Sequence, residues 1–188
     1  MSDENIVQLA ENYAKNKHNS QKRDDGEPFF NHPRRIVETL KEYDLPDEVL
    51  AAAWLHDVPE DCSSSYEDCI NQILMIEQKF GNKVSSLVHE LTCYSEKGEL
   101  FEQKTIRLLN LARRMSINAK WIKLADRFDN ISSMQCWNNK RRIRYARSTI
   151  KLLDNLCPIP EHSDTLFLKI LNIASQIIET EDVINIDK

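Results

Sequence analysis

Apolar residues recur every three or four positions along almost the whole chain, which is the spacing of helices that bury one face. The stripes lie in residues 6–14, 36–40, 49–54, 70–80, 84–91, 106–112 and 121–131, with two longer amphipathic stretches near 139–156 and 163–179. Only three glycines occur, each where a helix should stop or a loop should turn. We therefore expect an all-α fold: one helical bundle of about 8–10 helices over residues 1–180, followed by a frayed tail over residues 181–188.

Some helix ends can also be predicted. Residues 64–67 (Ser-Ser-Tyr-Glu) have the pattern of a capping box, so a helix should begin after Ser64 and end at Gly81. The inward face of this helix should carry Ile70, Ile73, Leu74 and Phe80. Asn82 should cap the next helix, and residues 94–99 should form an exposed loop. No glycine-rich phosphate-binding motif is present, which argues against the common α/β nucleotide-binding folds.

Composition and charge restrict the partners and the compartment. The 188 residues carry a net charge of −5, and an acidic chain is a poor general ligand for nucleic acid, whose phosphates are held by Lys and Arg. The five cysteines include no CxxC pair, which disfavours a disulfide framework or a thiolate zinc site. The N-terminus lacks an apolar signal core, and the longest apolar run, residues 49–55, is too short to span a bilayer. We expect a cytoplasmic protein without nucleic-acid or membrane partners.

Two histidines and two aspartates form the first functional signal. His56 and Asp57 stand side by side at the end of an apolar helix, where both side chains can turn towards one cation. His32 precedes Pro33 at a helix start, and Asp126 lies on an otherwise apolar helix, where an unpaired carboxylate is unfavourable unless a cation meets it. This mixed nitrogen and oxygen set favours Mn²⁺, Fe²⁺, Co²⁺ or a similar ion with positions open for water and substrate. Such an ion would lower the pKa of a bound water and polarise a phosphoryl oxygen.

Each of these residues also has a simpler interpretation. A histidine before proline is usually a helix cap or a surface residue, and a single His-Asp pair is common by chance. Asp126 could be buried as the partner of Arg127 or Lys123. The order His, His-Asp, Asp, with the last residue in a Lys-Leu-Ala-Asp-Arg context, favours a metal site over these alternatives.

Two further segments could act on a substrate. Glu60 and Asp61 follow the His-Asp pair closely, and although adjacent acids are usually solvated, one of them could hold the hydrolytic water or move its proton. The loop of residues 21–32 contains Arg23, which could lie flat on a purine or meet a phosphate. Lys22, Lys123 and Arg127 are candidate phosphate neutralisers, and solvated surface roles fit each of them equally well.

These segments together resemble the hydrolase domain of the RelA/SpoT homologues, especially the small stand-alone alarmone hydrolases. The family pattern reads approximately RxxGEPYxxHP, LHDxxEDT and KLADRLxN, and residues 23–33, 55–62 and 123–130 correspond to it. The resemblance covers roughly residues 8–155. It implies an HD-type metal-dependent phosphohydrolase that removes the 3′-pyrophosphate from (p)ppGpp, giving GDP or GTP and pyrophosphate.

The resemblance also implies roles for single residues. One Mn²⁺ would be held by His32, His56, Asp57 and Asp126. Glu60 and Asp61 match the acidic pair associated with the hydrolytic water in that family. Arg23 matches an arginine that packs on the base, and Asn130 an asparagine that contacts the sugar and phosphates.

The chain departs from the family pattern at several positions. Asp24 and Asp25 stand where the family often has a basic and a small residue, so their charge should weaken polyphosphate binding or change specificity. Phe29 replaces a frequent Tyr, and Cys62 replaces a frequent Thr. Two alternatives stay open: an HD-type nucleotidase or phosphodiesterase acting on another nucleotide, and a nucleotide-binding protein that has lost turnover. An adenine alarmone and a homo-oligomer are also compatible with the sequence.

Overall fold

Helices make up most of the protein, as the apolar spacing predicts. A computed structural model describes residues 5–95 and 98–186, and in these residues the helices are α1 (Ile6–Lys17), α2 (Asn31–Leu40), α3 (Asp47–Leu55), α4 (Val58–Asp61), α5 (Tyr66–Phe80), α6 (Asn82–Leu91), α7 (Phe101–Ala112), α8 (Ile117–Ser132), α9 (Asn139–Leu156) and α10 (Asp164–Ile186). Among the described residues, extended pairing is limited to one isolated bridge between Lys22 and Pro28. The all-α fold class is confirmed.

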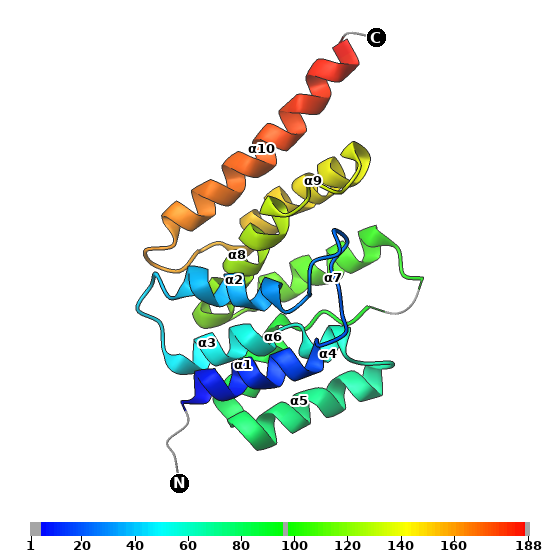
Figure 1. Ribbon diagram of the computed structural model, residues 1–188. Coiled ribbons are helices and arrows are strands. Elements are labelled where there is room, and N and C mark those ends of the chain that lie inside the picture. Colours follow the sequence, from blue (N-terminus) through cyan, green and yellow to red (C-terminus); the bar gives the residue numbers. More distant parts are fainter. Residues whose placement is uncertain (1–4, 96–97, 187–188) are drawn as a thin grey trace.

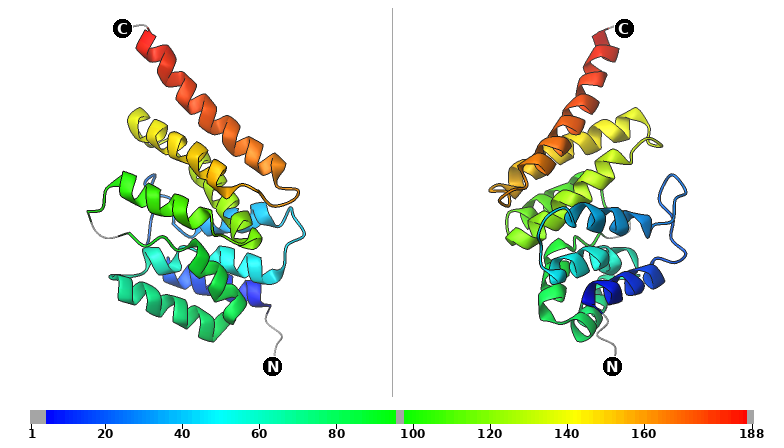
Figure 2. Two further views of the ribbon diagram at one scale, coloured as in Figure 1. Left: turned by 180° about the vertical axis from the view of Figure 1, so that it is seen from behind. Right: turned by 60° about the vertical axis from the view of Figure 1, so that its left-hand side comes forward.

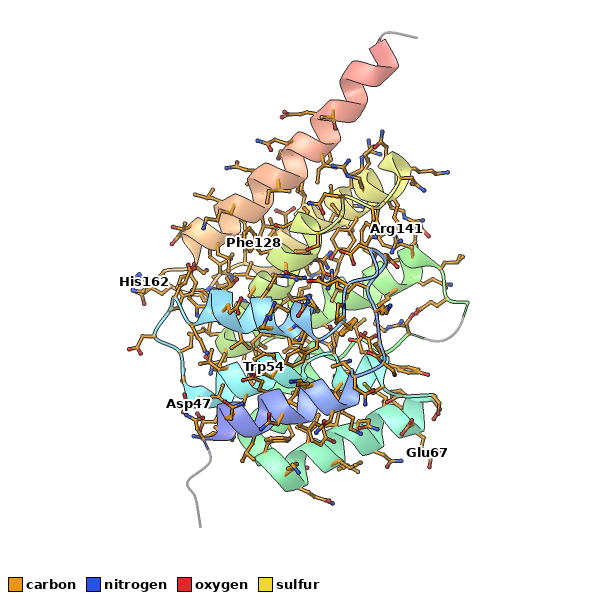
Figure 3. The ribbon with its side chains drawn as sticks, viewed as in Figure 1. Asp47, Trp54, Glu67, Phe128, Arg141 and His162 are labelled. Atoms are coloured by element: carbon orange, nitrogen blue, oxygen red, sulfur yellow. The ribbon has the colours of Figure 1, made fainter. Side chains whose placement is uncertain are left out.

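Two helices form the centre of the bundle. α3 packs against α1, α2, α6 and α8, and every residue from Val49 to Leu55 is buried. Trp54 lies on α3 (Figure 3) and stacks on Phe30 with 5.2 Å between ring centroids. Burying each large apolar side chain contributes about 1.5–3 kcal/mol, so this helix can hold polar residues rigidly at its C-terminal end. α8 also packs against α2, α6, α9 and α10, and it buries polar residues together with apolar ones.

The other helices surround these two (Figures 1 and 2). α1, α5 and α6 lie together with α3 in one half of the molecule, and α10 lies along α8 and α9 at the opposite end. α7 packs against α9. Consequently α2, α4, α7, α8 and α9, which come from distant parts of the chain, face a common region between the two halves.

The start and the inward face of α5 differ from the prediction. Ser65, one residue later than expected, caps the helix by accepting a hydrogen bond from the backbone N–H of Asp68, and Asp68 in turn accepts one from the N–H of Ser64. Leu74 is 48% exposed, so its predicted inward position is wrong. α5 is an outer helix that packs mainly against α4 and α6, with side-chain contacts to α1 such as that between Tyr13 and Phe80. Its buried face is therefore narrow, and it carries Cys69, Gln72, Ile76 and Phe80.

The predicted loop and the C-terminal boundary are partly described. Of residues 94–99, all but 96–97 are described, and they are not helical, although Tyr94 and Ser95 are partly buried rather than exposed. α10 continues to Ile186, beyond the expected end at residue 180, because no Gly or Pro interrupts the sequence there. The segment expected to be frayed is thus helical as far as residue 186, and residues 187–188 lie outside the described part. Within the described residues, no helix combines the length and the hydropathy needed to cross a bilayer.

Candidate active site

A cleft of about 470 Å³ opens between the two halves of the bundle. Its walls come from the loop between α1 and α2, from α2, α4, α7, α8 and α9, and from the connection between α8 and α9. Every predicted site residue except His56 lines the cleft, and these residues are Lys22, Arg23, His32, Asp57, Glu60, Asp61, Asp126, Arg127 and Asn130. His56 is buried directly behind them, with its ring centroid 5.4 Å from that of His32.

His32 projects from the first turn of α2 with a fixed orientation. Its Nδ1 lies 2.6 Å from Oδ2 of Asp129, and because an ionised carboxylate only accepts hydrogen bonds, Nδ1 carries the hydrogen. The other ring nitrogen, Nε2, lies 3.3 Å from Asp57 Oδ2 and 3.5 Å from Asp126 Oδ1. The imidazole therefore presents its second nitrogen to the two carboxylates that were predicted as its companions.

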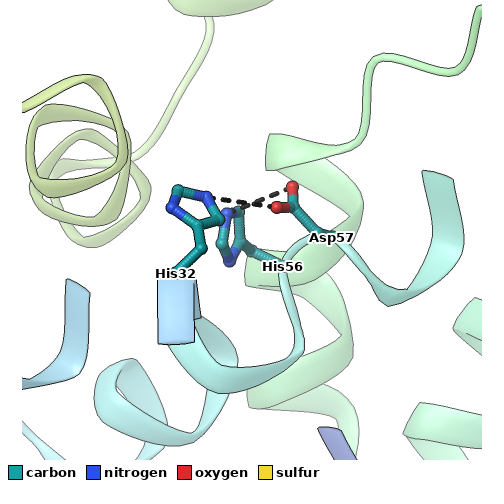
Figure 4. A group of neighbouring side chains, drawn as sticks. All are labelled: His32, His56 and Asp57. Carbon is teal, nitrogen blue, oxygen red and sulfur yellow. Dashed lines mark ion pairs between the residues drawn. The ribbon is translucent and has the colours of Figure 1, made fainter. Parts of the chain in front are cut away.

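His56 and Asp57 occupy the short bend between α3 and α4. The Nδ1 of His56 donates to the carbonyl of Ala53 at 2.8 Å, which leaves the lone pair on Nε2. That Nε2 lies 3.1 Å from Asp57 Oδ1, is buried, and has no hydrogen-bond partner. Pro59 stands in the first turn of α4, so it opens this helix and does not end the one before. Because the chain bends here, the two consecutive side chains point towards one centre (Figure 4).

The geometry of this group suits a divalent cation. Ligand atoms of His32, His56 and Asp57 all lie within 4.8 Å of one another. Asp126 adjoins them, with Oδ1 4.0 Å from Nε2 of His56. A buried nitrogen lone pair without a partner is unfavourable by itself, and a cation would satisfy it. The structure brings the four predicted side chains together: His32, His56 and Asp57 form a compact group, and Asp126 lies beside it.

The protonation of the group shows how strongly it attracts positive charge. Burial alone would lower the pKa of His32, but hydrogen bonds to Asp126, Asp129 and Asp57 outweigh it and raise the pKa well above its usual value. Burial alone would raise the pKa of Asp57, but the charge of His56 and contacts with His32 hold it well below its usual value. The carboxylates around the two imidazoles therefore favour positive charge at this centre.

Asp126 contacts both the candidate metal group, which consists of His32, His56 and Asp57 together with Asp126, and other residues of its own helix, α8. Its Oδ2 accepts a hydrogen bond from Lys123 at 2.9 Å, and its Oδ1 accepts one from Asn130 at 2.5 Å. These partners stand one turn before and one turn after Asp126 on the same face of the helix. The simpler interpretation of Asp126 as a partner of Lys123 and the metal interpretation are thus compatible, because each uses a different oxygen.

Asp129 completes the site and was missed by the sequence analysis. Besides holding His32, it accepts hydrogen bonds from the guanidinium of Arg35, with Nε to Oδ1 at 2.5 Å. Arg35 is held in turn by both carboxylate oxygens of Glu27 at 2.8 and 2.9 Å. Burial would raise the pKa of Asp129, but the hydrogen bonds from His32 and Arg35 lower it. The available signal was a second carboxylate three residues after Asp126 on an otherwise apolar helix.

The acidic pair on α4 divides into two different environments. Glu60 is held in place, because its Oε1 accepts from the backbone N–H of Cys93 at 2.6 Å and its Oε2 lies 3.4 Å from Lys104. For Asp61, desolvation in the cleft and the negative charges of Asp57 and Glu60 raise the pKa to about 7. Asp61 is nevertheless an exposed residue, so solvent screening weakens the energy behind this shift. Lys104 on α7 had no signal in the sequence.

The candidate substrate residues are already connected to one another. Arg23 donates to the side-chain oxygen of Asn130 at 2.9 Å and lies 3.6 Å from Asp129. Arg127 is buried, with its guanidinium over the ring of Tyr145 and its Nε without a hydrogen-bond partner. Lys22 lies on the cleft wall beside Arg23. Arg23 and Asn130 are therefore positioned by contacts with the same helix that carries Asp126.

Comparisons with known proteins agree with this geometry. The HD domain family matches residues 10–156. The guanosine-3′,5′-bis(diphosphate) 3′-pyrophosphohydrolase MESH1 of Drosophila melanogaster is 39% identical over 154 residues, which cover 77% of this chain and 80% of that protein. The enzyme of the same name from Aquifex aeolicus is 33% identical over 147 residues, which cover 78% of this chain but 20% of that protein. The chain thus spans about a fifth of the length of this longer relative.

A solved structure supports the same assignment. It is described as a metazoan ortholog of SpoT that hydrolyzes ppGpp, and it matches with a TM-score of 0.75 and 30% identity over 94% of this chain and 97% of that chain. The family match covers most of this chain, and the Drosophila relative is aligned over four-fifths of its own length. The chain therefore belongs to the HD domain family, among the RelA/SpoT homologues of the small alarmone-hydrolase type.

Proposed function

We propose that this protein hydrolyses the 3′-pyrophosphate of (p)ppGpp, or of a related alarmone, and that Mn²⁺ is its metal ion. The observation that carries the proposal is the convergence of ligand atoms from His32, His56 and Asp57 within 4.8 Å of one another, with Asp126 beside them, one turn before an acidic pair. The named activities of the relatives from Drosophila and Aquifex and of the metazoan SpoT ortholog support the choice of substrate.

His32, His56, Asp57 and Asp126 would hold the ion in this proposal. Two imidazole nitrogens and carboxylate oxygens suit a divalent transition ion with open positions. When bound, such an ion lowers the pKa of a water ligand and polarises a phosphoryl oxygen. Asp129 and the Ala53 carbonyl keep both imidazoles in the tautomer that offers Nε2 to the centre.

Asp61 and Glu60 take different parts in the proposed reaction. Glu60, fixed by Cys93 and Lys104, orients the attacking water. Asp61, with its pKa raised to about 7, takes the proton from that water as oxygen attacks the first phosphorus of the 3′-diphosphate. The bond between this phosphorus and the ribose 3′ oxygen breaks, and the proton passes from Asp61 to the 3′ oxygen. The products are GDP or GTP and pyrophosphate.

The remaining cleft residues bind the nucleotide in this proposal. Arg23 offers a flat guanidinium on which a purine ring can stack, and Asn130 offers an amide to the ribose and its phosphates. Arg127 and Lys22 add positive charge to the walls. Stacking reads the face of a ring and not its edge, so guanine and adenine alarmones are both compatible with Arg23.

Product analysis tests the proposal. The purified protein would be incubated with ppGpp and with ppApp, in Mn²⁺ or in excess chelator, and the products separated by anion-exchange chromatography. We expect pyrophosphate and a nucleoside 5′-diphosphate in Mn²⁺ and no product in chelator. Asp57→Ala should lose both bound metal and turnover. Release of inorganic phosphate instead would indicate another type of HD phosphohydrolase, and binding without any product would indicate a nucleotide-binding protein.

The proposed location is the cytoplasm, where alarmone substrates and a reducing environment are expected. The five cysteines, Cys62, Cys69, Cys93, Cys136 and Cys157, are all free thiols in the structure, which suits such an environment.

A further inference from the structure

The loop between α1 and α2 reaches across the cleft to the beginning of α9. Its turn is a small hairpin, in which the Arg23 N–H donates to the Glu27 carbonyl and Gly26 adopts a positive φ of 89°. At the tip, the carboxylate of Asp24 accepts a hydrogen bond from the indole N–H of Trp137 at 2.7 Å and forms an ion pair with Arg141, also at 2.7 Å. In the right-hand view of Figure 2, this loop stands away from α1 and rises towards the connection between α8 and α9.

Arg141 is the cationic member of this contact. Its guanidinium lies 3.8 Å from the ring centroid of Trp137, and both side chains line the cleft. Arg141 lies in the first turn of α9 (Figure 3), and this helix carries none of the proposed metal ligands. Arg141 is therefore placed to meet phosphates at the end of the substrate away from the 3′-diphosphate, except that Asp24 already occupies it.

The charges along the cleft make the contribution of Asp24 decisive. The described lining has six basic residues, which are Lys22, Arg23, Lys104, Lys123, Arg127 and Arg141. It also has six acidic residues, which are Asp24, Asp25, Asp57, Glu60, Asp61 and Asp126. The last four surround the proposed metal centre, whereas Asp24 and Asp25 do not contribute to it. Asp24 thus lies outside the proposed reacting centre and neutralises the charge of Arg141, in a cleft that is proposed to bind a highly negative nucleotide.

We propose that Asp24 is a specificity-determining residue: its carboxylate competes with the 5′-phosphates of the substrate for Arg141, and so favours ppGpp over pppGpp. This inference rests on the function proposed above. A longer 5′-phosphate chain brings more negative charge to the Asp24–Arg141 pair, and like charges repel each other. Asp24 acts through Arg141 and makes no contact with the described residues of the metal group.

Asp24→Asn is the direct test, because asparagine keeps an oxygen that can accept from Trp137 while it loses the charge that holds Arg141. The side chains of Arg141 and Asp24 are 46% and 53% exposed, and exposed pairs of this kind correspond to about 1.4- to 5-fold in an equilibrium constant. We expect KM for ppGpp to fall by about that factor, KM for pppGpp to fall further, and kcat to stay within about twofold. Raising the salt concentration should shrink the difference.

Two further variants decide the mechanism. Asp25→Asn removes the same charge from the next residue, whose carboxylate accepts a hydrogen bond from the N–H of Glu27. It should lower KM less than Asp24→Asn. In an Arg141→Gln background, which should raise KM by itself, Asp24→Asn should no longer improve binding.

The outcomes separate this inference from the proposed function. If both substrates are hydrolysed and Asp24→Asn changes KM no more than Asp25→Asn does, the specificity role is overturned and the proposed function is left intact. A benefit of Asp24→Asn that persists without Arg141 shows general repulsion and also overturns it. A rise in KM for Asp24→Asn shows that the contact supports binding, which is the opposite of the proposal. Failure of the wild type and every variant to hydrolyse either nucleotide overturns the function itself.

Discussion

Asp129→Asn isolates the effect of the carboxylate that holds His32. The substitution keeps the size of the side chain, and an amide oxygen can still accept from Nδ1 of His32, but the negative charge is lost. A charged acceptor makes the opposite ring nitrogen a stronger ligand, and removing such a partner typically lowers metal affinity by about 10- to 100-fold. This corresponds to about 1.4–2.7 kcal/mol. The contact is short, at 2.6 Å, and Asp129 is only 6% exposed, so we expect a loss in this range.

The fold should tolerate this change better than the metal site does. Arg35 loses one charged partner but keeps both oxygens of Glu27. The measurement is the Kd for Mn²⁺, obtained by competition with a fluorescent chelator at fixed pH, together with the thermal midpoint Tm of the metal-free protein. Asp154→Asn is a matched control, because Asp154 is exposed on α9 and lies outside the cleft. The control should bind Mn²⁺ like the wild type.

A double variant separates an orienting role of Asp129 from general destabilisation of the protein. If Asp129 acts through His32, then Asp129→Asn should have little further effect on Mn²⁺ affinity in a His32→Gln background. A Kd within twofold of the wild type for Asp129→Asn alone would refute the orienting role. If Asp129→Asn weakens Mn²⁺ binding in the His32→Gln background by the same factor as in the wild type, then Asp129 affects the site by a route other than His32.

Three other predictions concern the neighbouring charges. Asp61→Asn should lower kcat by about 10²- to 10⁴-fold and still bind Mn²⁺. Glu60→Gln should also bind Mn²⁺ and have a lower kcat. Full activity of either variant in a steady-state assay would contradict the role proposed for that residue. Because the pKa of Asp61 rises from 3.8 to about 7 on folding, the folded protein binds more protons between these values, and its stability falls as the pH rises through them. Asp61→Asn should therefore raise Tm in chelator at pH 8 and lose this advantage towards pH 5, and an unchanged Tm at pH 8 would argue against the shift. Lys123→Met leaves Asp126 buried without its ammonium partner, so urea unfolding should show a loss of about 3–5 kcal/mol, against at most about 1 kcal/mol for Lys83→Met, whose partner Glu48 is at the surface.

Much of the fold and the metal group could be predicted because both depend on local patterns. The buried face of a helix requires an apolar residue every three or four positions, so the all-α class and most helix positions follow from the spacing of apolar residues alone. The His-Asp pair and Asp126 stand out because polar residues are rare on apolar helices. The start of α5 was placed one residue early for a similar reason: both Ser64 and Ser65 can cap, and only the packed helix selects Ser65.

The missed residues depend on contacts between distant segments. Asp129 meets His32 across 97 positions, and nothing near Asp129 in the sequence indicates that partner. Arg141 stands in a basic run that is compatible with an ordinary solvated helix, and its importance follows only from the loop that brings Asp24 to it. Leu74 shows the reverse case, because periodicity identifies a potential inward face but not whether another element covers it.

The ion pairs of the cleft differ in a way that bears on how a substrate could enter. Lys123 and Asp126 are both 9% exposed, and separating them would leave buried charges without partners, so this pair has to persist through the proposed reaction. Arg141 and Asp24 are about half exposed, and Lys104 is 44% exposed beside Glu60, so water can replace either partner at little loss. In the proposed function, entering phosphates can therefore displace Asp24 from Arg141 without disturbing the buried pair beside the proposed metal ligands. The burial of each ion pair, and not its distance alone, therefore distinguishes two kinds of basic side chain. A buried one keeps its carboxylate partner, whereas an exposed one can exchange that partner for a substrate phosphate.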